Sequence, residues 1–194
     1  MARGTYDRAV LQPDFPIETE RLTLRPFRES DFDDLYAIQS RADVTRFLYW
    51  GVRSPDEVRD AVRVKAGMTA LKDEGEGLSI AVVWREIGRV VGDVSLNWHS
   101  REHRCAEIGF VFNPEFHGKG LAREASEAVL RLAFEDFGLH RAIGRLDARN
   151  DPSARLLERL GMRREAHFVD NEYVKGEWAS EAVYAILDRE WRER

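Results

Sequence analysis

The sequence predicts one α+β domain built on a mixed, mostly antiparallel β-sheet of about seven strands with about four helices. Short β-branched runs that alternate with polar residues predict the strands, and longer runs with helical spacing and clear capping residues predict the helices. The 194 residues suffice for one compact domain with a full core. We expect that domain at residues 17–194, after a flexible N-terminal arm at residues 1–16.

The first element is a short strand within residues 18–27, where Leu22 and Leu24 alternate with polar neighbours. Ser30 follows it, just before an apolar pattern of helical period that ends at Ile38. Serine is a preferred N-cap, because its hydroxyl accepts a hydrogen bond from a free backbone N–H of the first turn. We therefore expect a helix that starts at Ser30.

The clearest helix start in the chain is the stretch SPDEVRDAV. Ser54 can act as the N-cap, Pro55 suits the first helical position, and Glu57 completes a capping box. The apolar spacing predicts that this helix reaches about Asp73.

A β-hairpin is predicted next, over residues 78–98, with a turn in which Gly88 can take a positive φ. The run CAEIGFVF, residues 105–112, is a third strand of the same sheet. A helix follows from about residue 121 and must stop before Gly138, which is a typical C-terminal cap.

The last third of the chain predicts a strand, a helix and two more strands. The strand is HRAIGRLDA, and the helix opens at Asp151 and Pro152 and is ended by Gly161. The final strands are REAHFV and EAVYAIL. The central strand, helix, strand unit is the part that we expect to be parallel.

Composition and charge exclude several classes of protein. No apolar run approaches the roughly 18 residues that span a bilayer, and the first residues lack the apolar core of a signal peptide. Cys105 is the only cysteine, which suits a reducing compartment. The 30 basic and 35 acidic residues are well mixed, so no basic stripe for nucleic acid is visible. We expect a cytoplasmic protein without nucleic-acid or membrane partners.

Two glycines mark the junction NPEFHGKGLAREASEAVL, where the third strand of the sheet leads into a helix. Gly118 and Gly120 do not belong to a G-x-G-x-x-G fingerprint, because Arg123 stands at the third small position. The backbone N–H groups from Gly118 to Ala122 would nevertheless form an anion site at the positive end of the helix. The alternative is a tight turn that binds no ligand.

This junction is not isolated. The stretch HGKGLA, then ARNDPSARLLERLGM after the next strand, then NEYVKGEW, follow the order found in the Gcn5-related N-acetyltransferase superfamily. The opening ETERLTLRPFRESDFDDL and the stretch TRFLYWG resemble its ribosomal-protein N-acetyltransferase branch, the RimJ/RimL type. The resemblance covers about Glu18 to Leu187 and implies the three-layer fold of that superfamily.

The resemblance implies that acetyl-CoA is the cofactor and that the sheet is splayed where it binds. The pantetheine arm would run along the CAEIGFVF strand, with a main-chain N–H near Val111 or Phe112 at the thioester carbonyl. Asn150 would help to place the cofactor, although its side chain could equally serve as a helix cap. His117 occupies the position where the family has glutamine or arginine, and this change leaves the backbone amides intact. The implied cofactor-binding residues are Phe110, Val111, Phe112, His117, Gly118, Lys119, Gly120, Leu121, Ala122, Asn150 and Ser153.

Acetyl transfer to an amine also needs a base, because amines are mostly protonated at pH 7. By resemblance, the base is Glu172 of an EY pair, and Glu107 is the rival carboxylate. Many members protonate the leaving thiolate with a tyrosine, but Leu157 stands at that position here. In the RimJ/RimL branch a serine takes this role, and Ser153 matches it as a hydrogen-bond donor.

The resemblance leaves the acceptor open. We expect direct transfer to a primary amine, preferably the α-amine of a protein or peptide N-terminus. The alternatives are a small amine, such as a polyamine, an aminoglycoside or an amino-acid analogue, and a non-catalytic acyl-CoA sensor. The aromatics Phe47, Tyr49 and Trp50 either wall the acceptor site or belong to the core. Related proteins often pair as homodimers.

Cys105 is not expected to act in transfer or in metal binding. No base is arranged beside it in the sequence, so a covalent acyl-enzyme on its thiol is not expected. His99 and His103 lie close to it, yet no further pair of ligands completes the four that a closed zinc site needs. We therefore expect no metal site.

Overall fold

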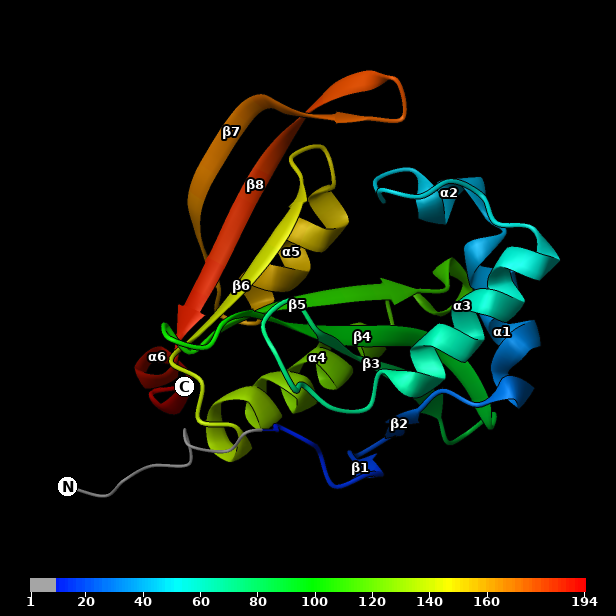
Figure 1. Ribbon diagram of the computed structural model, residues 1–194, viewed down its shortest axis with the longest axis horizontal. Coiled ribbons are helices and arrows are strands. Elements are labelled where there is room, and N and C mark those ends of the chain that lie inside the picture. The colour runs from blue at the N-terminus through cyan, green and yellow to red at the C-terminus, as the bar shows by residue number, and fades with distance from the viewer. Residues whose placement is uncertain (1–9) are drawn as a thin grey trace.

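The computed structural model describes residues 10–194 as an eight-stranded sheet with helices on both faces (Figure 1). The strand order is β1-β2-β3-β4-β5-β6-β8-β7. The strands are β1 (Ile17–Glu18), β2 (Leu22–Pro26), β3 (Gly77–Trp84), β4 (Arg89–Ser100), β5 (Cys105–Phe112), β6 (Arg141–Asp147), β7 (Arg163–Val174) and β8 (Glu177–Leu187). The helices are α1 (Phe32–Gln39), α2 (Ala42–Thr45), α3 (Pro55–Gly67), α4 (Leu121–Arg131), α5 (Asp151–Arg159) and α6 (Asp188–Arg192).

All neighbouring strands pair antiparallel except β5 and β6. Helix α4 and its π-helical extension, Leu132–Asp136, form the crossover between these two strands. The expectation of a parallel strand, helix, strand unit at the centre of the chain is confirmed, as is the predicted hairpin of β3 and β4 with Gly88 at a φ of 65°.

Strand β3 shows how the two faces are filled. Leu78, Ile80 and Val82 belong to the large apolar cluster that α4 and α5 cover, whereas Ala81 belongs to a second cluster with residues of α1 and α3. Successive side chains of a strand point to opposite faces, so helices cover the sheet on both sides. No helix among residues 10–194 is long and apolar enough to cross a bilayer.

Two predicted helix limits are wrong. Helix α3 ends at Gly67 instead of near Asp73, because the chain turns at Met68 and Leu71 then exchanges two backbone hydrogen bonds with Leu11. Ser30 does not cap α1 but lies inside a 3-10 turn, Glu29–Asp31. Asp31 precedes the helix instead, and its carboxylate binds the guanidinium of Arg25.

The structure contains more elements than the seven strands and four helices expected. Strand β1, α2 and the C-terminal α6 are additional, and β7 and β8 form a much longer hairpin than REAHFV and EAVYAIL. Leu11, within the segment expected to be an arm, is buried through its pairing with Leu71. Residues 1–9 of that segment lie outside the described residues.

The sheet opens between β5 and β6. These strands pair only at Cys105–Arg141, Ala106–Ala142 and Glu107–Ile143, although β5 continues to Phe112 and β6 to Asp147. Figure 1 shows the two strands diverging beyond this point, with β8 and β7 following β6. The predicted splay of the sheet is therefore present.

Candidate active site

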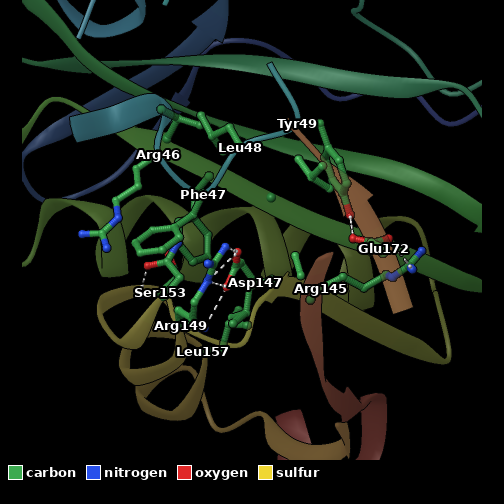
Figure 2. A pocket seen from close by; sticks show the side chains of 18 of the residues that line it. Arg46, Phe47, Leu48, Tyr49, Arg145, Asp147, Arg149, Ser153, Leu157 and Glu172 are labelled. Carbon is green, nitrogen blue, oxygen red and sulfur yellow. Dashed lines mark hydrogen bonds and ion pairs between the residues drawn. The ribbon is translucent and has the colours of Figure 1, made fainter. Parts of the chain in front are cut away.

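A cavity of about 250 Å³ lies in the opening between β5 and β6 (Figure 2). Its walls come from the loop after α2, from both diverging strands, from the start of α5 and from the tip of the β7–β8 hairpin. The lining residues are Arg46, Phe47, Leu48, Tyr49, Ser95, Ile108, Gly109, Phe110, Val111, Gly144, Arg145, Leu146, Asp147, Arg149, Asn150, Ser153, Leu157, Glu172, Val174, Lys175, Glu177 and Ala179.

The structure brings five of the expected site residues into this cavity. They are Phe110 and Val111 on β5, Asn150 and Ser153 at the start of α5, and Glu172 on β7. Beyond Glu107, no strand within residues 10–194 neighbours the edge of β5 away from β4. Alternate backbone N–H and C=O groups along that edge are therefore free to bind an extended ligand.

Glu172 reaches the cavity because β7 is irregular. The register with β8 shifts between Phe168 and Glu172, where Asp170 has a φ of 46°. Such a bulge re-aims the side chains that follow it. The Tyr49 hydroxyl donates a hydrogen bond of 2.8 Å to Oε2 of Glu172, as Figure 2 shows.

The ring of Tyr49 is exposed, while its hydroxyl end enters the cavity. Burial of the hydroxyl and its hydrogen bond to Glu172 raise the pKa of Tyr49 to about 12. Tyr49 therefore stays un-ionised at neutral pH and can only donate to the carboxylate of Glu172.

Arg145 on β6 lies between two carboxylates. Its Nε donates to Oε1 of Glu181 at 2.5 Å, and its guanidinium lies 3.7 Å from Oε1 of Glu172. Glu107 is half-buried at the last position where β5 pairs with β6, and it does not line the cavity. Burial raises the pKa of the Glu107 carboxyl, and the positive charge of Arg145 opposes that shift.

Helix α5 supplies the hydroxyl at the other wall. Asn150 is its N-cap, because the side-chain Oδ1 accepts a hydrogen bond of 3.3 Å from the backbone N–H of Ser153. The capping alternative for Asn150 is thus present, and its side chain also lines the cavity. Leu157 is buried against Gly144 of β6. Ser153 lies one helical turn before Leu157, so both residues are on the face of α5 that lines the cavity.

The glycine loop leads from the end of β5 into α4 and lies outside the lining of the cavity. Gly118 and Gly120 have φ values of 77° and 79°, which favour glycine over any other residue. A Cβ on Gly118 would meet no atom within 4 Å, so the space over the loop is open. Leu121 is buried, so it offers only its backbone N–H to a ligand.

Arg21 ties this loop to helix α4. Its guanidinium donates to the carbonyl oxygen of Lys119 at 2.9 Å and binds Glu124 of α4 at 2.7 Å. The Thr19 hydroxyl donates to the same carboxylate at 2.6 Å. The free amides of the first helical turn and the nearby cations fit the diphosphate of a coenzyme A molecule.

His117 is exposed on the loop, and its Nε2 lies 3.2 Å from the carbonyl oxygen of Phe112, so the ring contacts the last residue of β5. The backbone of Gly118 to Ala122 and the side chain of Lys119 are the other groups that this loop offers to an anion.

The aromatic segment before α3 is divided between two hollows. Phe47 and Tyr49 line the cavity, whereas Trp50 lines a groove of about 600 Å³ between α3 and β4. Lys175, at the tip of the β7–β8 hairpin, donates to the carbonyl oxygen of Thr45. This contact and the hydrogen bond from Tyr49 to Glu172 join the hairpin to the α2–α3 segment across the cavity.

Three charged residues of this region have no role assigned from the sequence: Arg21, Arg145 and Glu181. A signal existed for the latter two, because each is a charged residue inside or at the start of an otherwise apolar strand. Glu181 is only 3% exposed, and buried charges need a partner. Cys105 lies in a small buried cluster with Ile143 and Ala185, and burial raises the pKa of its thiol.

Comparison with known proteins adds independent findings. The family model described as an acetyltransferase (GNAT) domain matches residues 21–163. The uncharacterized N-acetyltransferase YnaD of Bacillus subtilis is 34% identical over 175 residues, which cover 90% of this chain and 98% of that protein. The crystal structure of a GNAT-family acetyltransferase from Bacillus anthracis superposes with a TM-score of 0.81 at 32% identity, covering 90% of this chain and 99% of the other.

Two structures with lower identity share the fold. The RimL ribosomal L7/L12 α-N-protein acetyltransferase in complex with coenzyme A is 20% identical, with a TM-score of 0.75, and the match covers 87% of this chain and 95% of that chain. A spermidine N-acetyltransferase from Vibrio cholerae in complex with coenzyme A and spermine is 22% identical, with a TM-score of 0.74, covering 90% and 99%.

Proposed function

Because the chain belongs to the GNAT acetyltransferase family, we propose that it transfers an acetyl group directly to the α-amine of a protein or peptide N-terminus. Acetyl-CoA is the cofactor of this family, and it supplies an activated acyl group whose leaving group is a thiolate. The observation that carries the proposal is that Glu172 and Ser153 line one cavity at the gap between β5 and β6.

The position of each residue supports a role for it in this reaction. Glu172 takes the proton from the attacking amine, directly or through one water molecule, and a backbone N–H at Val111 or Phe112 stabilises the oxygen on which negative charge develops. The Ser153 hydroxyl would donate a hydrogen bond to the sulfur of the leaving coenzyme A. The amides of Gly118 to Ala122 would bind its diphosphate, and Asn150 holds the start of α5 in place.

An α-amine is the easier acceptor to deprotonate, because its pKa is near 8 whereas that of a lysine side chain is above 10. The net charge of −5 adds a weak attraction for basic peptides. The likeness of ETERLTLRPFRESDFDDL and TRFLYWG to the RimJ/RimL branch points the same way, and we infer on this basis that the chain belongs to that branch. We also propose that it works in the cytoplasm and pairs as a homodimer.

A small amine is the second candidate acceptor. The observation that favours it is the covered cavity, where Tyr49 and Lys175 join opposite walls and leave about 250 Å³. A polyamine or a similar small molecule would fit beneath that cover more easily than a folded protein.

Competition between acceptors tests the proposal. Short basic peptides that start with Ser or Ala are mixed with a panel of small amines and radiolabelled acetyl-CoA, and kcat/KM is compared for each acceptor. The same peptides with a blocked N-terminus report transfer to lysine. We expect the free N-terminus to be preferred, and a preference of about a hundredfold for a small amine would reject the peptide assignment while leaving acetyl transfer intact.

A further inference from the structure

Arg145 projects from β6 just beyond Ile143, the last residue of β6 that pairs with β5. On one side its Nε donates to Glu181 of β8, and on the other its guanidinium faces Glu172 of β7. Figure 2 shows Arg145 beside Glu172, on the side of that carboxylate away from the labelled residues of α5. One side chain thus links the two strands that carry these carboxylates.

Glu181 is the fixed partner in this arrangement. It is 3% exposed, and its second oxygen accepts a hydrogen bond of 3.3 Å from the side-chain amide of Asn171. A buried carboxylate is costly without a charged partner, so the bond to Arg145 cannot be lost cheaply. The guanidinium is therefore held in one orientation on the wall of the cavity.

Glu172 is held from both sides. Its Oε2 accepts the hydrogen bond from Tyr49, and its Oε1 faces Arg145 at 3.7 Å. The 3.7 Å separation is that of an ion pair and is too long for a hydrogen bond. Arg145 therefore orients Oε1 of Glu172 without using its capacity to accept a hydrogen bond. An oxygen in this state can still accept a proton from an amine.

Arg145 also balances a cluster of carboxylates. Glu107 on β5 is within electrostatic range of Arg145, His99 of β4, Glu181 of β8 and Glu172 of β7. Burial raises the pKa of Glu107, while Arg145 and His99 lower it and the two other carboxylates raise it. Three acids thus gather around a single arginine, with Tyr49 and His99 as the other titratable neighbours.

We propose that Arg145 is a positioning residue for acetyl transfer: anchored by Glu181, it aims Glu172 at the cavity and places a positive charge beside that carboxylate. This role rests on the proposed function, in which Glu172 takes the proton of the amine. Arginine suits it better than lysine, because the planar guanidinium can meet two carboxylates at once.

The test compares pH profiles of kcat/KM for three variants. Arg145→Gln removes the positive charge, and Arg145→Lys keeps the charge but lacks the planar guanidinium that can meet two carboxylates. Arg141→Gln is the matched control. Arg141 lies on the same strand and binds Glu165 outside the cavity. Isothermal titration with coenzyme A checks that the cofactor site is intact in each.

Without the positive charge, the carboxylates of the cluster hold protons more readily. We therefore expect the acid limb of the Arg145→Gln profile to move about one unit to higher pH, with turnover at pH 7 about tenfold lower and coenzyme A affinity unchanged. Arg145→Lys should keep the limb and lose turnover, and Arg141→Gln should match the wild type. An unmoved acid limb in Arg145→Gln would overturn the effect of the charge on Glu172, and wild-type turnover in Arg145→Lys would overturn the positioning role.

Two outcomes separate this inference from the proposed function. A loss in Glu172→Gln without a moved limb in Arg145→Gln overturns the role of Arg145 alone, whereas wild-type turnover in Glu172→Gln overturns Glu172 as the base. If Arg145→Gln lacks the wild-type circular dichroism spectrum, Arg145→Lys decides, and kinetics equal to the wild type at every pH would then contradict the proposal.

Discussion

The two ends of the candidate site are built in opposite ways. The anion loop at the start of α4 comes from six consecutive residues, 117–122, and presents mainly backbone amides. The carboxylate end gathers side chains from β5, β6, β7, β8 and the segment before α3, which are far apart in the sequence. One end is local and made of main chain, and the other is non-local and made of side chains.

This difference predicts how each end responds to substitution. Backbone amides survive most side-chain changes, so only substitutions that alter φ or place a charge or bulk in the loop should weaken coenzyme A binding. At the carboxylate end each side chain carries a separate role, so exchange of a single functional group should alter turnover. The predictions below compare the two ends in order of expected effect.

The largest effect is expected for Glu172→Gln. Loss of the base should lower kcat by about 10²-fold at pH 7, with coenzyme A affinity unchanged. The loss should shrink toward pH 9, because an α-amine with a pKa near 8 is then largely neutral without help. Steady-state kinetics from pH 6 to about 9.5 with a peptide acceptor measure both features.

Two matched variants sharpen that result. Glu165 lies on the same strand as Glu172 but binds Arg141 and Arg163 outside the cavity. The turnover of Glu165→Gln should therefore equal that of the wild type. Glu107→Gln should cost less than about threefold if Glu172 is the base. A full loss in Glu107→Gln with little change in Glu172→Gln would assign the base to β5.

At the loop, Gly120→Glu should lower coenzyme A affinity at least about tenfold, because it puts a side chain at a positive φ and a carboxylate beside Arg21, whose bond to the carbonyl oxygen of Lys119 holds the loop amides in place. Gly120→Ala carries the strain without the charge and should lose less. His117→Gln should bind coenzyme A within about twofold of the wild type, since the ring contacts Phe112 at the end of β5. Calorimetry measures all three, and equal affinity in Gly120→Glu would contradict the loop assignment.

A smaller effect is expected at the wall formed by α5. Ser153→Ala should lower kcat about fivefold and leave KM for acetyl-CoA unchanged, because it removes a hydrogen-bond donor without altering the cap that Asn150 provides through the backbone. Asn150→Ala instead removes the cap and should destabilise the fold by about 1 kcal/mol. A raised KM with normal kcat in Ser153→Ala would place the hydroxyl in binding rather than in catalysis.

The smallest effect is a change in Tm, and it concerns Glu124, the carboxylate of α4 that Thr19 and Arg21 bind next to the loop. Burial opposes the charge of Glu124, but hydrogen bonds from Thr19 and Arg21 outweigh it and hold the pKa of this carboxyl below its usual range. A depressed pKa stabilises the fold above the usual glutamate range and ceases to do so as the pH falls through the lowered pKa. Glu124→Gln should therefore lower Tm by about 2–4 °C at pH 7 and by progressively less in acid.

Glu127→Gln is the control for that measurement. Glu127 binds Arg123 at 3.0 Å in an i,i+4 pair on the same helix and lies 3.4 Å from Arg194, and such solvent-accessible surface pairs contribute little. Its Tm should change by less than about 1 °C. An equal loss in both variants would show that any acid on α4 has the same effect.

The same difference between the two ends explains what the sequence could predict. The loop was predictable because its glycines, the strand before it and the helix after it are contiguous, and local rules assign each of them. The carboxylate end was only half predictable. Glu172 matches a family motif, but its contacts with Tyr49 and Arg145 depend on the register of β7 and on a bulge at Asp170. Such registers are set by tertiary pairing, which no short pattern encodes.

The errors in the helices have the same cause. Residues 68–72, MTALK, would continue α3 comfortably by helix propensity, but pairing of Leu71 with Leu11 uses the backbone groups that a longer helix would need. At Ser30, the ion pair of Asp31 with Arg25 fixes a 3-10 turn before α1. In both places a contact with a residue outside the helix overrode a valid local signal.

The claim that the two ends act independently is tested most directly by combining them. We would measure kcat/KM for acetyl-CoA in Gly120→Glu, in Glu172→Gln and in the double variant, at one pH and with one acceptor. Independent sites predict that the loss in the double variant equals the product of the two single losses within about threefold. A double variant no slower than the slower single variant would contradict the account, because it would show that the loop and the carboxylates work as one unit.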